Sequence, residues 1–133
     1  MANPDNLTIA PGGDVYIAED GSAPNLIWQL RSNGDIFPIA RNALSGEVTG
    51  LCFSPDGNWL FAAFYHHSSI QVVALDFSGK LVWQRTVGRY DPQEYKNGYA
   101  ASPLLYADSV IIAGDFDGDG DIDGNDFLIW QNN

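Results

Sequence analysis

Short β-prone runs alternate along the chain with turn signals, and this pattern predicts an all-β protein. Val, Ile, Leu, Phe, Tyr and Trp fill the runs, whereas Gly, Pro, Asp, Asn and Ser mark the positions between them. Apolar runs on either side of such turns are typical of β-hairpins. The turn signals are Gly12-Gly13-Asp14, Asn33-Gly34-Asp35, Pro55-Asp56-Gly57-Asn58, Ser78-Gly79-Lys80 and Ala107-Asp108-Ser109.

The pattern also repeats at an interval of about 44 residues. Leu7–Asp20 aligns with Leu51–Phe64, and Asn25–Arg41 aligns with Ile70–Thr86 at nearly the same offset. Each unit holds two hairpins, and the interval is typical of a propeller blade. A third unit begins at Ser102 and is predicted to end after two strands. The fold prediction is therefore two to three antiparallel four-stranded propeller-like blades.

So few blades cannot close a ring, because propellers close with four to eight. Open blades leave strand edges whose N–H and C=O groups require partners. The chain is therefore an open or sandwich-like domain, a homo-oligomer joined through open strand edges, or a fragment of something larger. We expect the first, with a β domain over residues 1–114 and a calcium loop and short helix over residues 115–133.

The calcium loop is predicted from twelve residues, Asp-Phe-Asp-Gly-Asp-Gly-Asp-Ile-Asp-Gly-Asn-Asp, that begin at Asp115. An EF-hand-type loop needs oxygen donors at positions 1, 3, 5, 9 and 12, a backbone carbonyl at 7 and Gly at 6. Gly120 stands at that sharp turn. Ca²⁺ is the predicted cofactor, because it is a hard cation that takes six to eight oxygens. The predicted ligands are Asp115, Asp117, Asp119, Asp123 and Asp126 through their side chains, and Asp121 through its carbonyl.

The run Phe127-Leu128-Ile129-Trp130 follows the loop, and we expect a short helix there. Asp126 would lie near the N-terminus of that helix, where a negative charge is favourable. The loop is single and ends in Asp instead of the usual Glu. We therefore expect weak binding, with a Kd on the order of 10⁻⁴ to 10⁻³ M, as in extracellular modules.

Charge and composition exclude several other classes of partner. The net charge is -11 with only six Lys and Arg, which argues against nucleic acid and against anionic membranes. No apolar run reaches the length of a membrane-spanning helix, and no signal-peptide pattern follows Met1. Cys52 is the single cysteine, and its apolar neighbours predict a buried, inert thiol.

Candidate catalytic groups are few. His66 and His67 are adjacent on a predicted strand, so their side chains would point to opposite faces and would not readily chelate one ion together. The sequence contains no Gly-x-Ser-x-Gly motif, no phosphate-cradling loop and no Cys–His pair at a persuasive spacing. No catalytic residue is predicted.

The first half of the chain resembles the PhoX-type alkaline phosphatases. The resemblance covers Asn3–Phe64 and rests on Pro4-Asp5-Asn6-Leu7, Ala18-Glu19-Asp20-Gly21, Glu47-Val48-Thr49-Gly50 and Cys52-Phe53-Ser54-Pro55-Asp56-Gly57. That family implies a propeller that holds calcium and iron ions, hydrolyses phosphate esters and works outside the cytoplasm. The resemblance implies that Asn6, Asp20 and Glu47 lie in motifs near the metal site. It also implies an extracellular or periplasmic location.

Two further resemblances cover the second half. Val73–Asp115 resembles a pyrroloquinoline-quinone-type propeller repeat through the Ala74–Trp83 segment, which implies that Trp83 staples neighbouring blades. Asp115–Gln131 resembles half of a dockerin-type repeat; with one loop of the usual two, cohesin is not expected as a partner. Three resemblances in one short chain indicate a mosaic or artificially assembled sequence.

Three hypotheses follow for function. The first is a calcium-binding β module without catalysis of its own. The second is a PhoX-like metal-dependent phosphoesterase fragment that is active only if a full ring assembles. The third is a structural propeller fragment that associates with itself.

Overall fold

The structure, a computed structural model, describes residues 1–21, 24–43, 46–66, 69–89, 102–107, 109–113 and 127–131. These residues form eleven strands and no helix, so none of them forms a helix long and apolar enough to cross a membrane. The strands are β1 (Pro4–Ile9), β2 (Val15–Glu19), β3 (Asn25–Leu30), β4 (Ile36–Asn42), β5 (Val48–Phe53), β6 (Leu60–His66), β7 (Ser69–Leu75), β8 (Leu81–Arg89), β9 (Leu104–Tyr106), β10 (Ser109–Ala113) and β11 (Phe127–Gln131).

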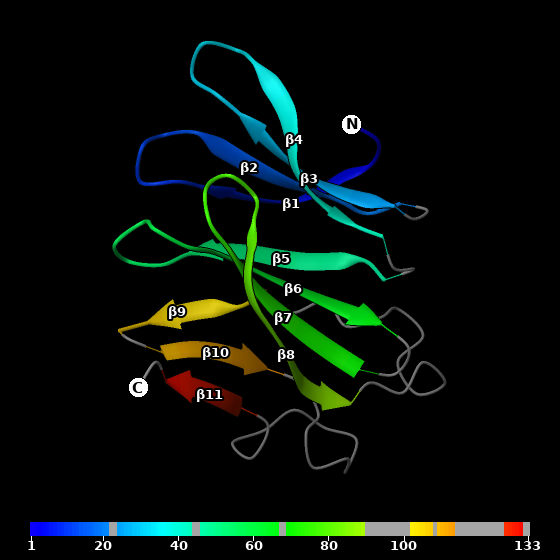
Figure 1. Ribbon diagram of the computed structural model, residues 1–133, viewed down its shortest axis with the longest axis vertical. Coiled ribbons are helices and arrows are strands. Elements are labelled where there is room, and N and C mark those ends of the chain that lie inside the picture. The colour runs from blue at the N-terminus through cyan, green and yellow to red at the C-terminus, as the bar shows by residue number, and fades with distance from the viewer. Residues whose placement is uncertain are drawn as a thin grey trace.

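The strands form three antiparallel sheets that lie one above another (Figure 1). The first two sheets have the orders β1-β2-β3-β4 and β5-β6-β7-β8, which is the meander of a propeller blade. The third has the order β11-β10-β9. The first strands of successive sheets are neighbours, β1 beside β5 and β5 beside β9. The predicted all-β, propeller-like fold is therefore confirmed, and we call the three sheets blades 1, 2 and 3.

The hairpin turns follow from the predicted turn residues. Gly13, Gly34, Gly57 and Gly79 have φ values of 92°, 92°, 69° and 79°, in the left-handed region that other residues rarely adopt. Asp56 and Asp76 stabilise two of these turns by accepting backbone hydrogen bonds from residues two or more positions further along. The structure thus places a left-handed Gly in the first and third turns of each complete blade.

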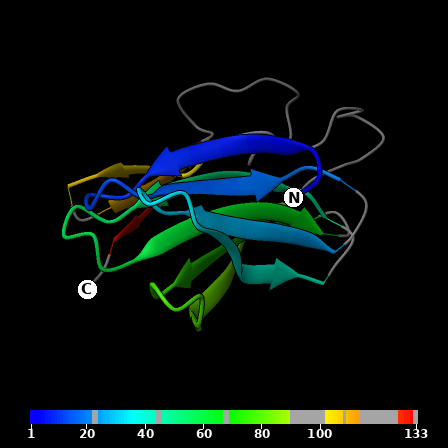
Figure 2. The same ribbon diagram turned by 90° about the horizontal axis from the view of Figure 1, so that it is seen from above.

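The core lies between the blades, so blade 2 buries both of its faces. One apolar cluster joins blade 1 to blade 2, and the second joins blade 2 to blade 3. At the first interface, the ring of Tyr16 meets the ring of Phe53 edge-on at a centroid distance of 4.9 Å. Viewed from above, the strands of the successive blades cross at an angle (Figure 2), as twisted sheets packed face to face do.

The third blade differs from the sequence-based expectation. Residues 127–131 form β11, which pairs with the whole length of β10, so the predicted short helix is wrong. Without β11, one edge of β10 would expose a row of unpaired N–H and C=O groups. The run Phe-Leu-Ile-Trp is rich in residues with high β propensity, and pairing with β10 outweighs the helix-dipole term that favoured a helix. Blade 3 therefore has three strands in the described residues, one more than predicted.

Candidate cation site at the propeller mouth

One edge of the molecule carries the longer connections between strands. The arrowheads of β2, β6 and β10 all point to this edge, on the right in Figure 1. Because neighbouring strands are antiparallel, β3 and β7 begin at the same edge. We call this edge the mouth and define it by the ends of β2, β3, β4 and β5 at Glu19, Asn25, Asn42 and Val48.

Glu19 is a buried carboxylate at the end of β2 with backbone partners on both sides. Its side chain is 6% exposed and accepts hydrogen bonds from the Ala2 N–H at 2.7 Å and the Leu26 N–H at 3.0 Å. Burial alone raises the pKa of Glu19, but these bonds and the nearby Trp28 indole outweigh it, so the pKa is lowered from 4.5. The indole N–H is buried and lies outside hydrogen-bonding geometry with every described acceptor. Glu19 therefore anchors the N-terminal strand and is not free to bind a cation.

Asn25 ties the mouth ends of the two blades together. Its side chain is 2% exposed, accepts a hydrogen bond from the Gly21 N–H at 2.9 Å and donates one to the Gly46 carbonyl at 3.2 Å. Asn42 also donates to the Gly46 carbonyl, at 2.9 Å. Asn25 thus holds Gly21, the neighbour of Asp20, and Gly46, the neighbour of Glu47, in fixed positions.

Three carboxylates, those of Asp5, Asp20 and Glu47, interact electrostatically at the mouth. Burial raises the pKa of Glu47, and the negative charges of Asp20 and Asp5 raise it further. Asp5 and Asp20 are exposed, whereas Glu47 is partly buried. Carboxylates that repel one another in this way are stabilised when a cation lies among them. The mouth is therefore a region of uncompensated negative charge.

Of the three residues that the PhoX resemblance indicated, the structure brings Asp20 and Glu47 close enough for their charges to interact. The third, Asn6, donates a hydrogen bond to the carboxylate of its sequence neighbour Asp5 at 2.5 Å. Asp5 lies in one of the PhoX-like motifs but was not predicted as a site residue, and Asn25 was not predicted either. The signal for Asn25 is a polar residue at the first position of an apolar strand.

The donor chemistry at the mouth suits a hard cation, but the donors do not converge. Carboxylate and amide oxygens are ligands that Ca²⁺ accepts. Among the described residues, no three His, Cys, Asp or Glu side chains surround one metal position. Carboxylate oxygens are therefore present at the mouth, but the described residues do not form a metal site there.

The predicted calcium ligands Asp115, Asp117, Asp119, Asp121, Asp123 and Asp126 lie outside the described residues, as does His67. The structure does describe the two ends of that segment. Ala113 and Phe127 are paired in the β10–β11 ladder, and the end of β10 lies at the same edge as the end of β2. The two described residues that flank the segment are therefore held next to each other at the mouth edge.

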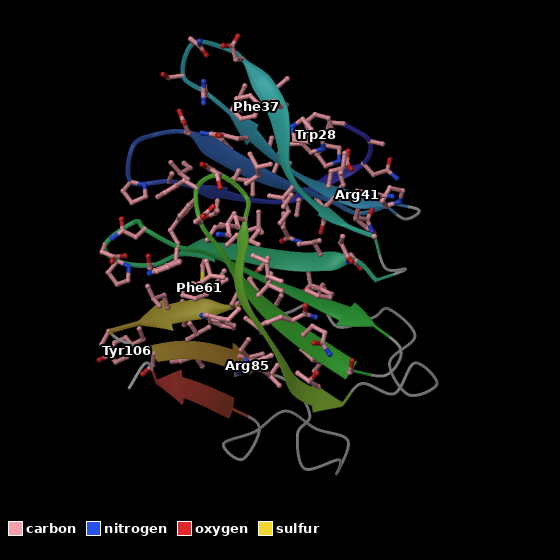
Figure 3. All side chains as sticks on the ribbon, in the orientation of Figure 1. Trp28, Phe37, Arg41, Phe61, Arg85 and Tyr106 are labelled. Atoms are coloured by element: carbon pink, nitrogen blue, oxygen red, sulfur yellow. The ribbon has the colours of Figure 1, made fainter. Side chains whose placement is uncertain are left out.

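Cys52 lies apart from the mouth, whereas a cavity between blades 1 and 2 has the mouth residues Asn42 and Val48 in its lining. Cys52 is partly buried instead of fully buried as predicted, and burial raises the pKa of its thiol to about 12, which is consistent with a thiol of low reactivity. The cavity has a volume of about 270 Å³ and is lined mainly by apolar side chains, with Arg41 among the polar ones. Neither Asp20 nor Glu47 lines this cavity. Figure 3 shows Arg41 on β4, beside the mouth ends of the strands.

Antiparallel four-stranded blades with an acidic mouth define the chain as a β-propeller-type protein. Comparison with known families then narrows the class. The sequence profile of the family described as alkaline phosphatase PhoX matches residues 1–68, which include blade 1, β5, β6 and the acidic mouth. The chain belongs to the PhoX family. No curated protein and no solved structure matches the chain.

Proposed function

We propose that this chain is a calcium-binding β-propeller module of the PhoX family that has no catalytic activity on its own. The observation that carries the proposal is the Ala113–Phe127 pair, which closes a twelve-residue Asp-rich segment within one hairpin. An EF-hand-type loop needs its two ends close together, so that ligands at positions 1 and 12 reach one ion. Antiparallel pairing of the flanking residues supplies that condition. Residues Asp115 to Asp126 would then hold Ca²⁺, which supplies positive charge at the mouth edge.

The mouth carboxylates support a second, weaker cation site. Asp5, Asp20 and Glu47 are close enough for their charges to interact, and the Asn25 hydrogen bonds hold the two segments that carry them. These oxygens would face a hard divalent cation from one side only. Ligands from further blades would complete the coordination, as in a closed ring.

The alternative function is metal-dependent hydrolysis of phosphate esters outside the cytoplasm. It is favoured by the family match, which includes all three residues that the resemblance implicates, Asn6, Asp20 and Glu47. Metal ions bound at the mouth would polarise a phosphoryl oxygen, which is chemistry that the protein residues alone do not provide. Because the described blades leave that site open on one side, we propose that activity requires assembly of a full ring.

The other two resemblances lead to narrower proposals. Trp83 packs against Phe61 with ring centroids 5.8 Å apart, beside the cluster that joins blades 2 and 3. The ring contact lies within blade 2, and it is the packing of Trp83 against the cluster between blades 2 and 3 that supports the blade-stapling role implied by the pyrroloquinoline-quinone-type repeat. The dockerin-type half repeat supports calcium binding without cohesin as a partner.

Isothermal titration with CaCl₂ tests the calcium proposal. Wild type should bind with a Kd on the order of 10⁻⁴ to 10⁻³ M, and the double variant Asp115→Ala/Asp126→Ala should weaken binding by about tenfold or more. Asp35→Ala is the matched control, because Asp35 is an exposed turn carboxylate on blade 1. Calcium uptake by the double variant equal to that of wild type would refute the proposal.

A p-nitrophenyl phosphate assay tests the absence of catalysis. The isolated chain, supplied with Ca²⁺ and Fe³⁺, should hydrolyse the ester no faster than the metal ions alone. Metal-dependent turnover that is lost in Glu47→Gln and retained in Asp35→Ala would instead establish the phosphoesterase alternative.

A further inference from the structure

Blade 1 and blade 2 are copies of one unit, and their strand registers allow residue-by-residue comparison. In blade 1, Ile9 pairs with Val15; in blade 2, the corresponding pair is Phe53 with Leu60. The same alignment makes Leu7 of blade 1 equivalent to Leu51 of blade 2. These equivalences show what each face of a blade is built to contact.

The face of blade 2 that carries Leu51 and Phe53 is covered by blade 1. Leu51 is 6% exposed, and Phe53 packs edge-on against Tyr16 of blade 1. The equivalent face of blade 1 is open to solvent at β1, where Leu7 is 65% exposed and Ile9 is 63% exposed. Its other apolar members in the alignment are Val15, Ile17, Trp28 and Leu30. Blade 1 therefore presents a blade-docking face that lacks its blade.

Blade 3 has the complementary face free. Leu105, Val110 and Ile112 pack toward blade 2, so the opposite face of the third sheet points away from the stack. That face carries Leu104, which is 61% exposed, and Tyr106, which is 72% exposed. Figure 3 shows Trp28 on blade 1 and Tyr106 on blade 3 at opposite ends of the stack. The two free faces correspond to the two sides of one blade-to-blade interface.

We propose that two copies of this chain associate head to tail, with the free face of blade 3 in each copy covering the free face of blade 1 in the other. A head-to-tail contact closes only if the rotation between copies completes a circle. Three blades in each chain make a two-chain ring of six, within the four to eight blades that propellers use. The contact continues the packing that already joins blades 1 and 2 within one chain.

In this dimer the two copies contact each other through the faces of blades 1 and 3, and not by hydrogen bonding between outer strand edges. The outer strand β4 contains Pro38, which has no N–H to donate to an added strand. By contrast, Leu7, Ile9, Leu104 and Tyr106 are large apolar side chains left in water. Burying such a patch is the main driving force for association of this kind.

Sedimentation equilibrium in about 0.15 M salt, where charge repulsion is screened beyond about 8 Å, tests the proposal. Wild type should have twice the mass of one chain, with dissociation only at low concentration. Ile9→Glu on blade 1 and Leu104→Glu on blade 3 should each be monomeric, with a dimer dissociation constant raised by about tenfold or more. Val82→Glu is the matched control, because Val82 is 44% exposed but belongs to blade 2, whose two faces are already covered.

Mixing the two variants gives the decisive result. Each keeps one intact free face, so an equimolar mixture of Ile9→Glu and Leu104→Glu should form a heterodimer with one of the two interfaces restored. Circular dichroism should show native β structure in both, and Ile9→Thr and Leu104→Thr replace them if it does not. A monomeric wild type, a Leu104→Glu chain that remains dimeric, or a mass that grows beyond two chains would each overturn the proposal.

Discussion

Ala113 and Phe127 face each other as the terminal pair of the β10–β11 ladder, so the described residues on either side of the Asp-rich segment are held next to each other. Under the proposed function this pairing would couple calcium binding to folding, because the ion would hold together the same two chain segments that the ladder joins. A ligand that binds only the folded chain stabilises it by mass action.

Calcium should therefore raise the stability of wild type. At a calcium concentration ten to a hundred times the Kd, the expected gain is about 1.4–2.7 kcal/mol. For a domain of this size, that gain corresponds to a rise in Tm of about 5–10 °C. Thermal unfolding followed by circular dichroism, with CaCl₂ and then with EDTA, measures the shift. Asp115→Ala/Asp126→Ala should show no shift, and a wild-type Tm that EDTA leaves unchanged contradicts the prediction.

Glu19→Gln should destabilise the chain by about 1.5–3 kcal/mol at neutral pH. Two backbone N–H groups donate hydrogen bonds to the two carboxylate oxygens of Glu19, and in the variant one of them would meet the NH₂ group of the Gln side chain, which cannot accept a hydrogen bond. The lowered pKa of Glu19 also fixes the pH dependence. Its contribution to stability is present above the unfolded pKa of about 4.5 and is lost as the pH falls through the lower folded pKa.

Urea unfolding from about pH 3 to about pH 7 checks both statements. The difference between wild type and Glu19→Gln should be largest at neutral pH and should shrink as the pH falls below 4.5. A difference that stays constant over this range would show that Glu19 is not the titrating group.

Glu47→Gln should have the opposite effect in the absence of metal. The pKa of Glu47 is raised, so folding favours its protonated form. Its contribution is fully present below the unfolded pKa of 4.5 and is lost as the pH rises through the higher folded pKa. Removing the charge should therefore leave the urea midpoint at neutral pH unchanged or slightly higher. A clearly lower midpoint would mean that the Glu47 carboxylate has a stabilising partner.

Much of the fold could be predicted from the sequence, because turn residues and the repeat of strands are local features. Gly13 and Gly57 mark equivalent turns, and the 44-residue offset between them is the blade repeat itself. The strand at residues 127–131 was not accessible, because a short apolar run suits either a helix or a strand. Its choice depends on the open edge of β10, which exists only in the folded sheet.

At the mouth, too, residues in local motifs could be predicted from the sequence, whereas contacts made by tertiary packing could not. The PhoX-like motifs indicated Asn6, Asp20 and Glu47, but no sequence spacing reveals that Asp5 acts on Glu47 from another strand. The role of Asn25 could not be predicted from the sequence for a related reason. Its importance comes from the Gly46 carbonyl on the following segment, which only the packing of blade 1 on blade 2 brings within 3.2 Å.

Gly79→Ala should be one of the most destabilising single changes in the described chain, because this Gly meets two separate constraints. Its φ of 79° is unfavourable for any residue with a Cβ. A Cβ at this position would also lie 1.7 Å from the Ile39 carbonyl oxygen of blade 1, so the β7–β8 turn would have to move away from β4. Gly34 has a φ of 92° and no atom within 4 Å of such a Cβ, which makes Gly34→Ala the matched control.

Gly34→Ala should cost about 1–2 kcal/mol from backbone strain alone. Gly79→Ala should cost at least about 2 kcal/mol more, because the clash is with backbone and no rotamer relieves it. Urea unfolding of the two variants separates the terms, since both carry the same strain and only one carries the contact. Equal losses of stability in the two variants would mean that the β7–β8 turn does not rest on β4, and that blades 1 and 2 are spaced further apart at this edge.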